Sequence, residues 1–288
     1  MRVMACPAAS VSDTLTLCVS GIVNDSLRER ILELAPTFAL VGTNYSAAGT
    51  AGELYAFPVN NQRNEEIVIG RVTKDELKDM YSYYLVDKSK PGRSVYDSML
   101  ASAPNGICPL CGVGHAVTLD HFLPKAKFPM FSILPLNLVP ACRDCNTGKL
   151  TAYAKEFGEQ SLHPYFDHGK YIDDQWLFAR VEQTAPASVS FFVAPPAAWL
   201  DGDKERVLSH FMSLKLGERF SVLAAGELSS INAMLKAYIA GIGPDAVREY
   251  LNAYAMAELS LHKNSWKAAL LLALASSNWF CQIGFQLE

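Results

Sequence analysis

Residues 108–146 read CPLCGVGHAVTLDHFLPKAKFPMFSILPLNLVPACRDCN, and this stretch decides how the rest of the chain is interpreted. It begins with one Cys-x-x-Cys pair and ends with a second pair followed by Asn146. Each pair sets two thiolates close enough to bind one ion, and two pairs supply the four ligands of a closed, tetrahedral zinc site. The alternative is four unrelated buried thiols, but two spaced pairs in one region favour zinc. We therefore predict a structural Zn²⁺ ion bound by Cys108, Cys111, Cys142 and Cys145.

The segment between the two pairs has the order strand, loop, strand, helix. A first apolar run, Val117 to Leu119, ends at Asp120 and His121. A second run, Leu136 to Pro140, precedes a predicted helix from Arg143 to Leu150. The loop-rich segment could not be held together by core burial alone, so we expect the zinc ion to staple it. This would bring residues far apart in sequence close to one another.

Hydrolysis of a phosphodiester needs a base for the attacking water and positive charge near the phosphate and the leaving oxygen. A neutral imidazole suits the first task, and His121 is the candidate. Oxygen ligands suit Mg²⁺ or Mn²⁺, and Asp120 and Asn146 are the candidates for the second task. Asn137 could orient the loop or the imidazole ring. Because neighbouring residues on a strand point to opposite faces, Asp120 and His121 can share a site only if the strand ends or bends there.

These motifs resemble the HNH (His-Me finger, ββα-metal) endonucleases, in particular the zinc-bearing branch that includes phage endonuclease VII. The resemblance covers about 43 residues, from Cys108 to Leu150, within the sequence of 288. It implies that His121 is the general base, that Asp120 and Asn146 bind the catalytic metal, and that Asn137 is structural. The sequence pattern LDHFLPK…FP…NLVP…CN also resembles HNH proteins of bacterial anti-phage systems, some of which act beside an ATPase. A partner ATPase is therefore a further expectation.

Basic residues gather in this region although the chain as a whole has a net charge of −4. Between His121 and Lys155 there is a single acid, Asp144. Contacts to DNA phosphates would give salt-sensitive affinity without sequence information, whereas the plain alternative is a set of solvated side chains. The candidates for phosphate contact are Lys125, Lys127, Arg143 and Lys149. His163, just after the motif, is a further candidate near the scissile phosphate, although such a histidine more often caps or packs.

The flanking sequence is mainly helical. Helices are expected from Ser26 to Phe38, after a Thr73–Glu76 capping box and from Ser94 to Ala101. Residues 42–64 are expected to be a loop that could contain a short strand. A strand is expected at Ser188 to Val193. Four helices are then expected: Leu200 to Leu214, Leu216 to Ala240, Pro244 to Leu261 and Ser265 to Phe280.

The sequence thus predicts a mainly α protein, α+β overall, with a small ββα-metal module stapled by zinc. We expect an N-terminal mostly helical region over 1–103, the HNH module over 104–170 and a C-terminal mainly helical region over 171–288. Seven cysteines without a secretory signal do not suggest a disulfide framework. The apolar run Ala268 to Ala275 is too short to span a bilayer. We therefore expect a cytoplasmic protein that does not bind membranes.

Three functions compete at this point. The first is a metal-dependent endonuclease that cuts DNA. The second is a zinc-stapled module that binds nucleic acid or protein without cutting, which would not need Asp120, His121 and Asn146 together. The third is a nuclease subunit controlled by another protein, which the acidic net charge and the large helical flanks favour.

Overall fold

The chain divides into two compact units, Met1–Asp167 and His168–Glu288. The computed structural model describes residues 1–149, 152–239 and 241–287, with the main chain alone for Lys149. Within these ranges the protein is mostly helical, with three small two-stranded antiparallel sheets. This confirms the α+β class with helices predominant. Of the boundaries expected from the sequence, the one between residues 103 and 104 lies inside the first unit, and the one after residue 170 lies close to the division between the units.

The first unit begins with helices whose ends the sequence explains. The Ser10 and Asp13 side chains form a capping box at the start of α1. The predicted capping box of Thr73 and Glu76 is confirmed at the start of α4. The helices and short strands of the first unit before residue 104 are α1 (Val11–Ser20), α2 (Asp25–Leu32), α3 (Ala35–Ala51), β1 (Ile67–Ile69), β2 (Val72–Thr73), α4 (Lys74–Asp79), a π-helical turn (Met80–Leu85) and α5 (Arg93–Ala101).

Helix α3 corrects two expectations. The helix predicted from Ser26 to Phe38 is in fact two helices, and the residues expected to form a loop from position 42 continue α3 to Ala51. Glycine and threonine lower the intrinsic helix propensity here, but tertiary packing overrides it, because Phe38, Tyr45 and Gly49 are buried. The helix ends at Gly52, whose φ of 76° is the left-handed conformation typical of glycine at this place.

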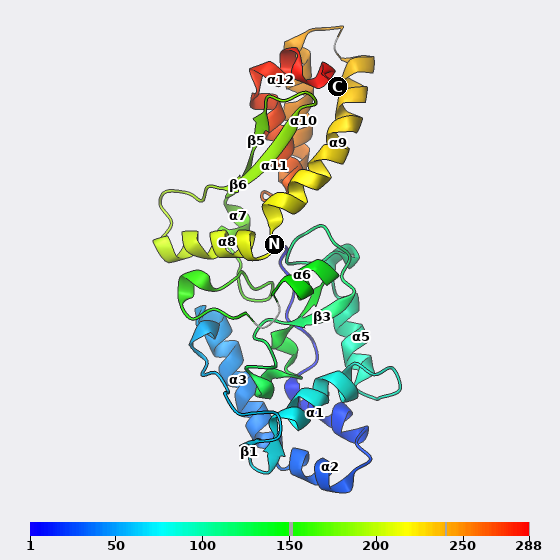
Figure 1. Cartoon of the computed structure of the whole chain (residues 1–288), viewed down its shortest axis with the longest axis vertical. Coiled ribbons are helices and arrows are strands. Elements are labelled where there is room, and N and C mark those ends of the chain that lie inside the picture. Colours follow the sequence, from blue (N-terminus) through cyan, green and yellow to red (C-terminus); the bar gives the residue numbers. More distant parts are fainter. Residues whose placement is uncertain (150–151, 240, 288) are drawn as a thin grey trace. The chain divides into compact units, whose positions relative to one another are not determined.

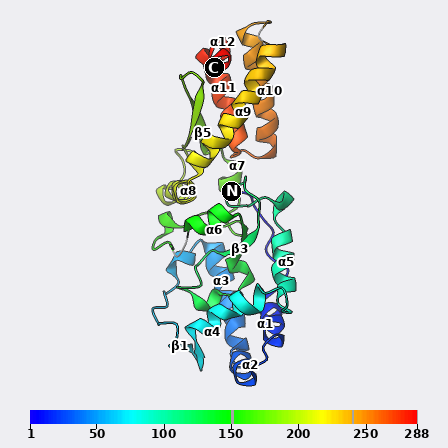
Figure 2. The same ribbon diagram turned by 45° about the vertical axis from the view of Figure 1, so that its right-hand side comes forward.

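The centre of the first unit is the antiparallel pair β3 (Thr118–His121) and β4 (Leu138–Ala141), followed by α6 (Arg143–Lys149). Thr118 lies opposite Ala141, and His121 lies opposite Leu138. Helix α6 packs against β3, as Figures 1 and 2 show. The predicted order of strand, loop, strand and helix is therefore present. Leu150, the last residue of the predicted helix, lies outside the described residues.

The second unit is a helical bundle with one hairpin. Strands β5 (Leu177–Glu182) and β6 (Ser188–Val193) pair over their full length. Strand β6 confirms the predicted strand, whereas the sequence does not predict β5. Helix α11 packs against β5, α9 packs against β6, and α10 packs against α11 (Figure 2). The helices are α7 (Lys170–Asp173), α8 (Asp201–Ser213), α9 (Leu216–Tyr238), α10 (Pro244–Leu261), α11 (Trp266–Ser276) and α12 (Asn278–Gln282).

The last predicted helix, Ser265 to Phe280, is interrupted at Ser277. This residue has extended dihedral angles, and its side chain accepts a hydrogen bond from the main-chain nitrogen of Phe280. It therefore ends α11 and caps α12, which is a common role of serine. Among the described residues, no helix is both long and apolar enough to cross a membrane.

Candidate functional site

Four buried thiols meet in the first unit. The sulfur atoms of Cys108, Cys111, Cys142 and Cys145 all lie within 4.8 Å of one another. The Sγ atoms of Cys111 and Cys142 are 3.8 Å apart. A tetrahedral zinc site with Zn–S bonds of about 2.3 Å has sulfur–sulfur edges of about 3.8 Å. The donor set and its spacing therefore fit a metal ion such as zinc, as the sequence predicts.

Local main-chain geometry builds the cluster. The main-chain nitrogen of Gly114 donates to the Cys111 sulfur at 3.4 Å, and Gly112 turns the chain with a φ of 72°. Cys142 follows β4 directly, and Cys145 lies in the first turn of α6. Hydrogen bonds shared among the four thiols lower the pKa of Cys111 and Cys142 and raise the pKa of Cys108 and Cys145. Two of the thiols are thus biased toward the thiolate form that metals bind, and a bound metal ion would have to displace the protons of the other two.

His121, the last residue of β3, is buried and has a fixed orientation. Its Nε2 lies 2.9 Å from the carbonyl oxygen of Ser132. Because a carbonyl can only accept a hydrogen bond, Nε2 must carry the hydrogen. In the neutral ring Nδ1 is then the basic nitrogen, and the tautomer is set by the loop that follows β3.

Tyr81 is a contact of His121 that sequence reasoning missed. Its ring meets the imidazole edge-on, with ring centroids 4.3 Å apart, and its hydroxyl donates to the carbonyl of Leu119 at 2.6 Å. Burial raises the pKa of Tyr81, and the neighbouring Asp120 carboxylate adds to this effect. Tyr81 lies in the π-helical turn after α4, and such turns often mark functional sites. Tyr81 lies 38 positions before Leu119, the residue that accepts its hydrogen bond, so nothing local in the sequence indicates this contact.

Asn137 is fully buried and anchors the loop between β3 and β4. Its Oδ1 accepts hydrogen bonds from the Tyr45 hydroxyl at 2.8 Å and from the main-chain nitrogen of Leu123 at 2.7 Å. Its Nδ2 donates to the carbonyls of Leu123 at 3.0 Å and Phe131 at 3.2 Å. Since Ser132 follows Phe131 in the chain, Asn137 positions the loop that orients His121.

Asp120 and Asn146 lie on elements that touch each other. Along β3 Leu119 and His121 are buried, whereas Thr118 and Asp120 are half-buried, so Asp120 projects from the opposite face of the strand to His121. Both residues lie in the regular register of the antiparallel pair, Asp120 opposite Val139 and His121 opposite Leu138. Asn146 is half-buried on α6, which packs against β3. Within the described ranges, the four thiols form the one cluster of three or more His, Cys, Asp or Glu ligands.

The four basic candidates differ in their surroundings. The Lys125 ammonium lies 2.5 Å from the Ser82 hydroxyl and 4.6 Å from the centre of the Tyr81 ring. Burial lowers the pKa of Lys125, and the charge of Lys78 lowers it further. Lys127 is half-buried and Arg143 is exposed. The side chain of Lys149 lies outside the described residues.

His163 is buried in a turn. Its main-chain nitrogen donates to the Asp167 carboxylate at 2.6 Å, and its Nδ1 accepts from the nitrogen of Tyr165 at 3.2 Å. Its ring packs against Phe122 and Phe166, with centroids 4.2 and 4.7 Å apart. These contacts give His163 a capping and packing role.

Fold and site together define a mostly helical α+β protein with a buried four-cysteine site that could hold a metal ion. The chain is 33% identical to protein ea31 of Escherichia phage lambda over an alignment of 298 residues, which covers 97% of this chain and 99% of that protein. It therefore belongs to the family of phage lambda protein ea31. No protein-family model matches the chain. No solved structure matches it either.

Proposed function

We propose that the chain is a metal-dependent endonuclease of the HNH type that hydrolyses phosphodiester bonds of DNA. The observation that carries this proposal is the hydrogen bond from His121 to the Ser132 carbonyl, which leaves Nδ1 as the basic nitrogen of a neutral ring. The four-cysteine cluster, the β3–β4 pair and helix α6 support it, because they have the order that the sequence motif predicts.

The residues would divide the reaction among them. His121 takes the proton of a water molecule as the water oxygen bonds to phosphorus, and the bond from phosphorus to the 3′ oxygen breaks. The departing oxygen receives its proton from solvent. Asp120 and Asn146 would hold Mg²⁺ or Mn²⁺, which stabilises the charge on the phosphate and on the departing oxygen. Asn137 acts as a positioning residue, and a zinc ion bound by the four cysteines would hold β3 against α6.

Phosphate contacts complete the proposal. Among the three candidates whose side chains the structure describes, Arg143 is the exposed one. Lys127 and Lys149 are the next candidates, whereas Lys125 would first have to leave the Ser82 hydroxyl. We further propose, from the resemblance alone, that the protein acts in the cytoplasm as an anti-phage effector beside an ATPase. Cleavage assays with and without a co-expressed ATPase and ATP test this last part.

The main test is cleavage of supercoiled plasmid by the purified full chain with Mg²⁺ or Mn²⁺. We expect His121→Ala to slow cleavage by about 10²- to 10⁴-fold, the usual contribution of a general base. His115→Ala is the matched control, because His115 is an exposed histidine near the same strand. Since His121 is buried, zinc content and thermal unfolding of each variant are measured as well, and His121→Gln is included as a variant that retains a donor near Ser132.

The outcomes separate the competing functions. Cleavage that requires added Mg²⁺ and is lost in both His121 variants supports the proposal. A protein that binds plasmid without cutting it, with either metal and with or without the ATPase, supports the binding module and contradicts the nuclease. Metal analysis is expected to find one zinc per chain in every arm.

A further inference from the structure

Strand β5 has one paired edge and one open edge. It pairs with β6 alone among the described residues. The main-chain nitrogen of Ala194 donates to the carbonyl of Trp176 at 2.8 Å, which marks these residues as a hydrogen-bonded position of the antiparallel pair. Such positions alternate along the strand. The main-chain groups of Ala179 and Val181 therefore face away from β6.

At one end of this outer edge, the main-chain groups of β5 already have hydrogen-bond partners. At Leu177 the outward nitrogen donates to Asn264 Oδ1 at 3.0 Å, and the carbonyl accepts from Gln175 Nε2 at 3.4 Å. For Ala179 and Val181 the described part of the chain offers no such partner. Two donors and two acceptors are thus presented with the spacing of an extended strand, as on other unpaired sheet edges.

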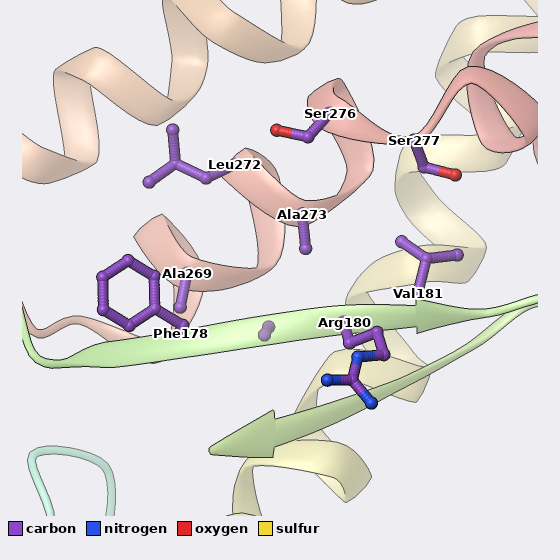
Figure 3. A pocket seen from close by; sticks show the side chains of 9 residues that line it. Phe178, Arg180, Val181, Ala269, Leu272, Ala273, Ser276 and Ser277 are labelled. Carbon is purple, nitrogen blue, oxygen red and sulfur yellow. The ribbon is translucent and has the colours of Figure 1, made fainter. Parts of the chain in front are cut away.

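A groove of 440 Å³ runs along this edge. Figure 3 shows β5 on one side of it and α11 on the other, with Ala269, Leu272 and Ala273 on the helix. The wall is therefore mainly apolar. Arg180 adds one cation, which is exposed and forms no ion pair with any described residue. Its guanidinium lies 5.5 Å from the centre of the Phe192 ring on the outer face of the hairpin.

We propose that the β5 edge binds an extended peptide segment of a partner protein, which adds to the sheet as a third strand. The main-chain groups of Ala179 and Val181 are complementary to another extended main chain, and pairing of this kind is a common mode of peptide recognition. Alternate side chains of the peptide would be apolar and face α11. A side chain between them would be acidic and lie beside Arg180. The phosphates of a nucleic acid could pair with Arg180, but a nucleic acid has no main chain that matches the repeating donors and acceptors of Ala179 and Val181.

The test uses the full chain and two labelled heptapeptides. Both peptides have valine at the four odd-numbered positions and threonine at the second and sixth. The central residue is aspartate in one peptide and lysine in the other. We expect the wild type to bind the aspartate peptide about tenfold more tightly than the lysine peptide, because opposite charges on neighbouring strands attract and like charges repel. Arg180→Glu is expected to reverse this preference. The readout is fluorescence anisotropy, and it does not depend on nuclease activity.

A second variant tests the main chain. Val181→Pro removes an outward nitrogen donor without removing a hydrogen bond to β6, a place where a sheet tolerates proline. It is expected to weaken both peptides at least about tenfold. Glu249→Arg, an exposed charge reversal on α10, is the control and should change neither affinity. Thermal unfolding verifies that each variant is folded.

Three results would overturn the proposal. The first is that neither peptide binds the wild type at millimolar concentration. The second is that binding is unaffected by both Val181→Pro and Arg180→Glu. The third is a wild-type dimer in light scattering that Val181→Pro abolishes, because a second copy of the chain would then occupy the edge.

Discussion

Every hydrogen-bonding site of the Asn137 side chain has a partner, and all of these partners lie on the loop it anchors or on α3. An amide can accept two hydrogen bonds and donate two, and here it does both. Removing the amide would leave buried main-chain groups of Leu123 and Phe131 without a partner. The free-energy cost of such unpaired groups exceeds the net stabilisation that the hydrogen bonds provide.

We therefore expect Asn137→Ala to lower the free energy of unfolding by about 2–4 kcal/mol, measured by urea titration. Asn44→Ala is the matched control, since Asn44 is exposed on α3 beside Tyr45, and should change stability by less than about 0.5 kcal/mol. Equal effects of the two substitutions would show that Asn137 does not have the anchoring role assigned to it.

At the residue scale the sequence predicts residues with a distinctive chemistry and spacing, such as the cysteines. It does not predict contacts made by residues that are distant in the sequence. The two Cys-x-x-Cys pairs are sufficient to predict the cluster, because cysteine spacing reports ligand geometry directly. Nothing local indicates that Tyr45 bonds to Asn137 or that Ser132 orients His121. Tyrosine and serine are common in many roles, and these contacts exist only after the loop has folded.

At the element scale, helix α3 shows how packing replaces propensity. A Cβ atom added at Gly49 would lie 2.4 Å from the Phe166 ring, whereas one added at Gly226 in α9 would meet nothing within 4 Å. The same substitution in two helices should therefore have opposite effects. This difference explains why the sequence predicts a loop where the structure has a helix, because Gly49 is required by a close contact that the sequence does not display.

We expect Gly49→Ala to destabilise the protein by about 1–3 kcal/mol through overpacking. Gly226→Ala should stabilise it by about 0.5–1 kcal/mol, because alanine loses less conformational freedom in a helix. Urea unfolding of both variants measures the difference. Stabilisation by Gly49→Ala would contradict the close approach of α3 to Phe166.

A second element-scale prediction concerns the link between α2 and α4. Arg30 donates to Glu76 at 2.8 and 2.6 Å, and these hydrogen bonds hold the pKa of Glu76 below its usual value. A lowered carboxylate pKa stabilises the folded state above the unfolded pKa of about 4.3, and this contribution is lost as the pH falls through the folded value. Glu76→Gln preserves the helix cap but removes the charge.

We expect Glu76→Gln to cost about 1 kcal/mol at pH 7, a modest value because both side chains are partly exposed. The difference from wild type should shrink below about pH 4.3. Urea unfolding at pH 7, 5 and 3 tests this. Glu33→Gln, in the more exposed pair with Arg71, should have little effect at any pH. A pH-independent loss for Glu76→Gln would rule out the charge as its cause.

At the scale of the whole molecule, the sequence predicts three regions by composition, whereas the contacts divide the chain into two units. The N-terminal helices look independent in the sequence because each has its own apolar periodicity. In the structure they supply Tyr45 to Asn137 and Tyr81 to Leu119, so they share a core with the cysteine cluster and its hairpin. Long-range contacts of this kind decide unit boundaries, and composition does not report them.

This division predicts a local response to loss of metal. If the four thiolates bind zinc, a strong zinc chelator should destabilise Met1–Asp167 by several kcal/mol and leave the other unit folded. Hydrogen–deuterium exchange should accelerate in β3 and β4, while α10 and α11 keep their protection. Cys111→Ser should reproduce this pattern, whereas Cys6→Ser, which removes an exposed thiol, should not. Unchanged exchange in β3 and β4 after complete metal removal would mean that core packing alone holds the hairpin against α6, and the zinc would then be dispensable for the candidate site.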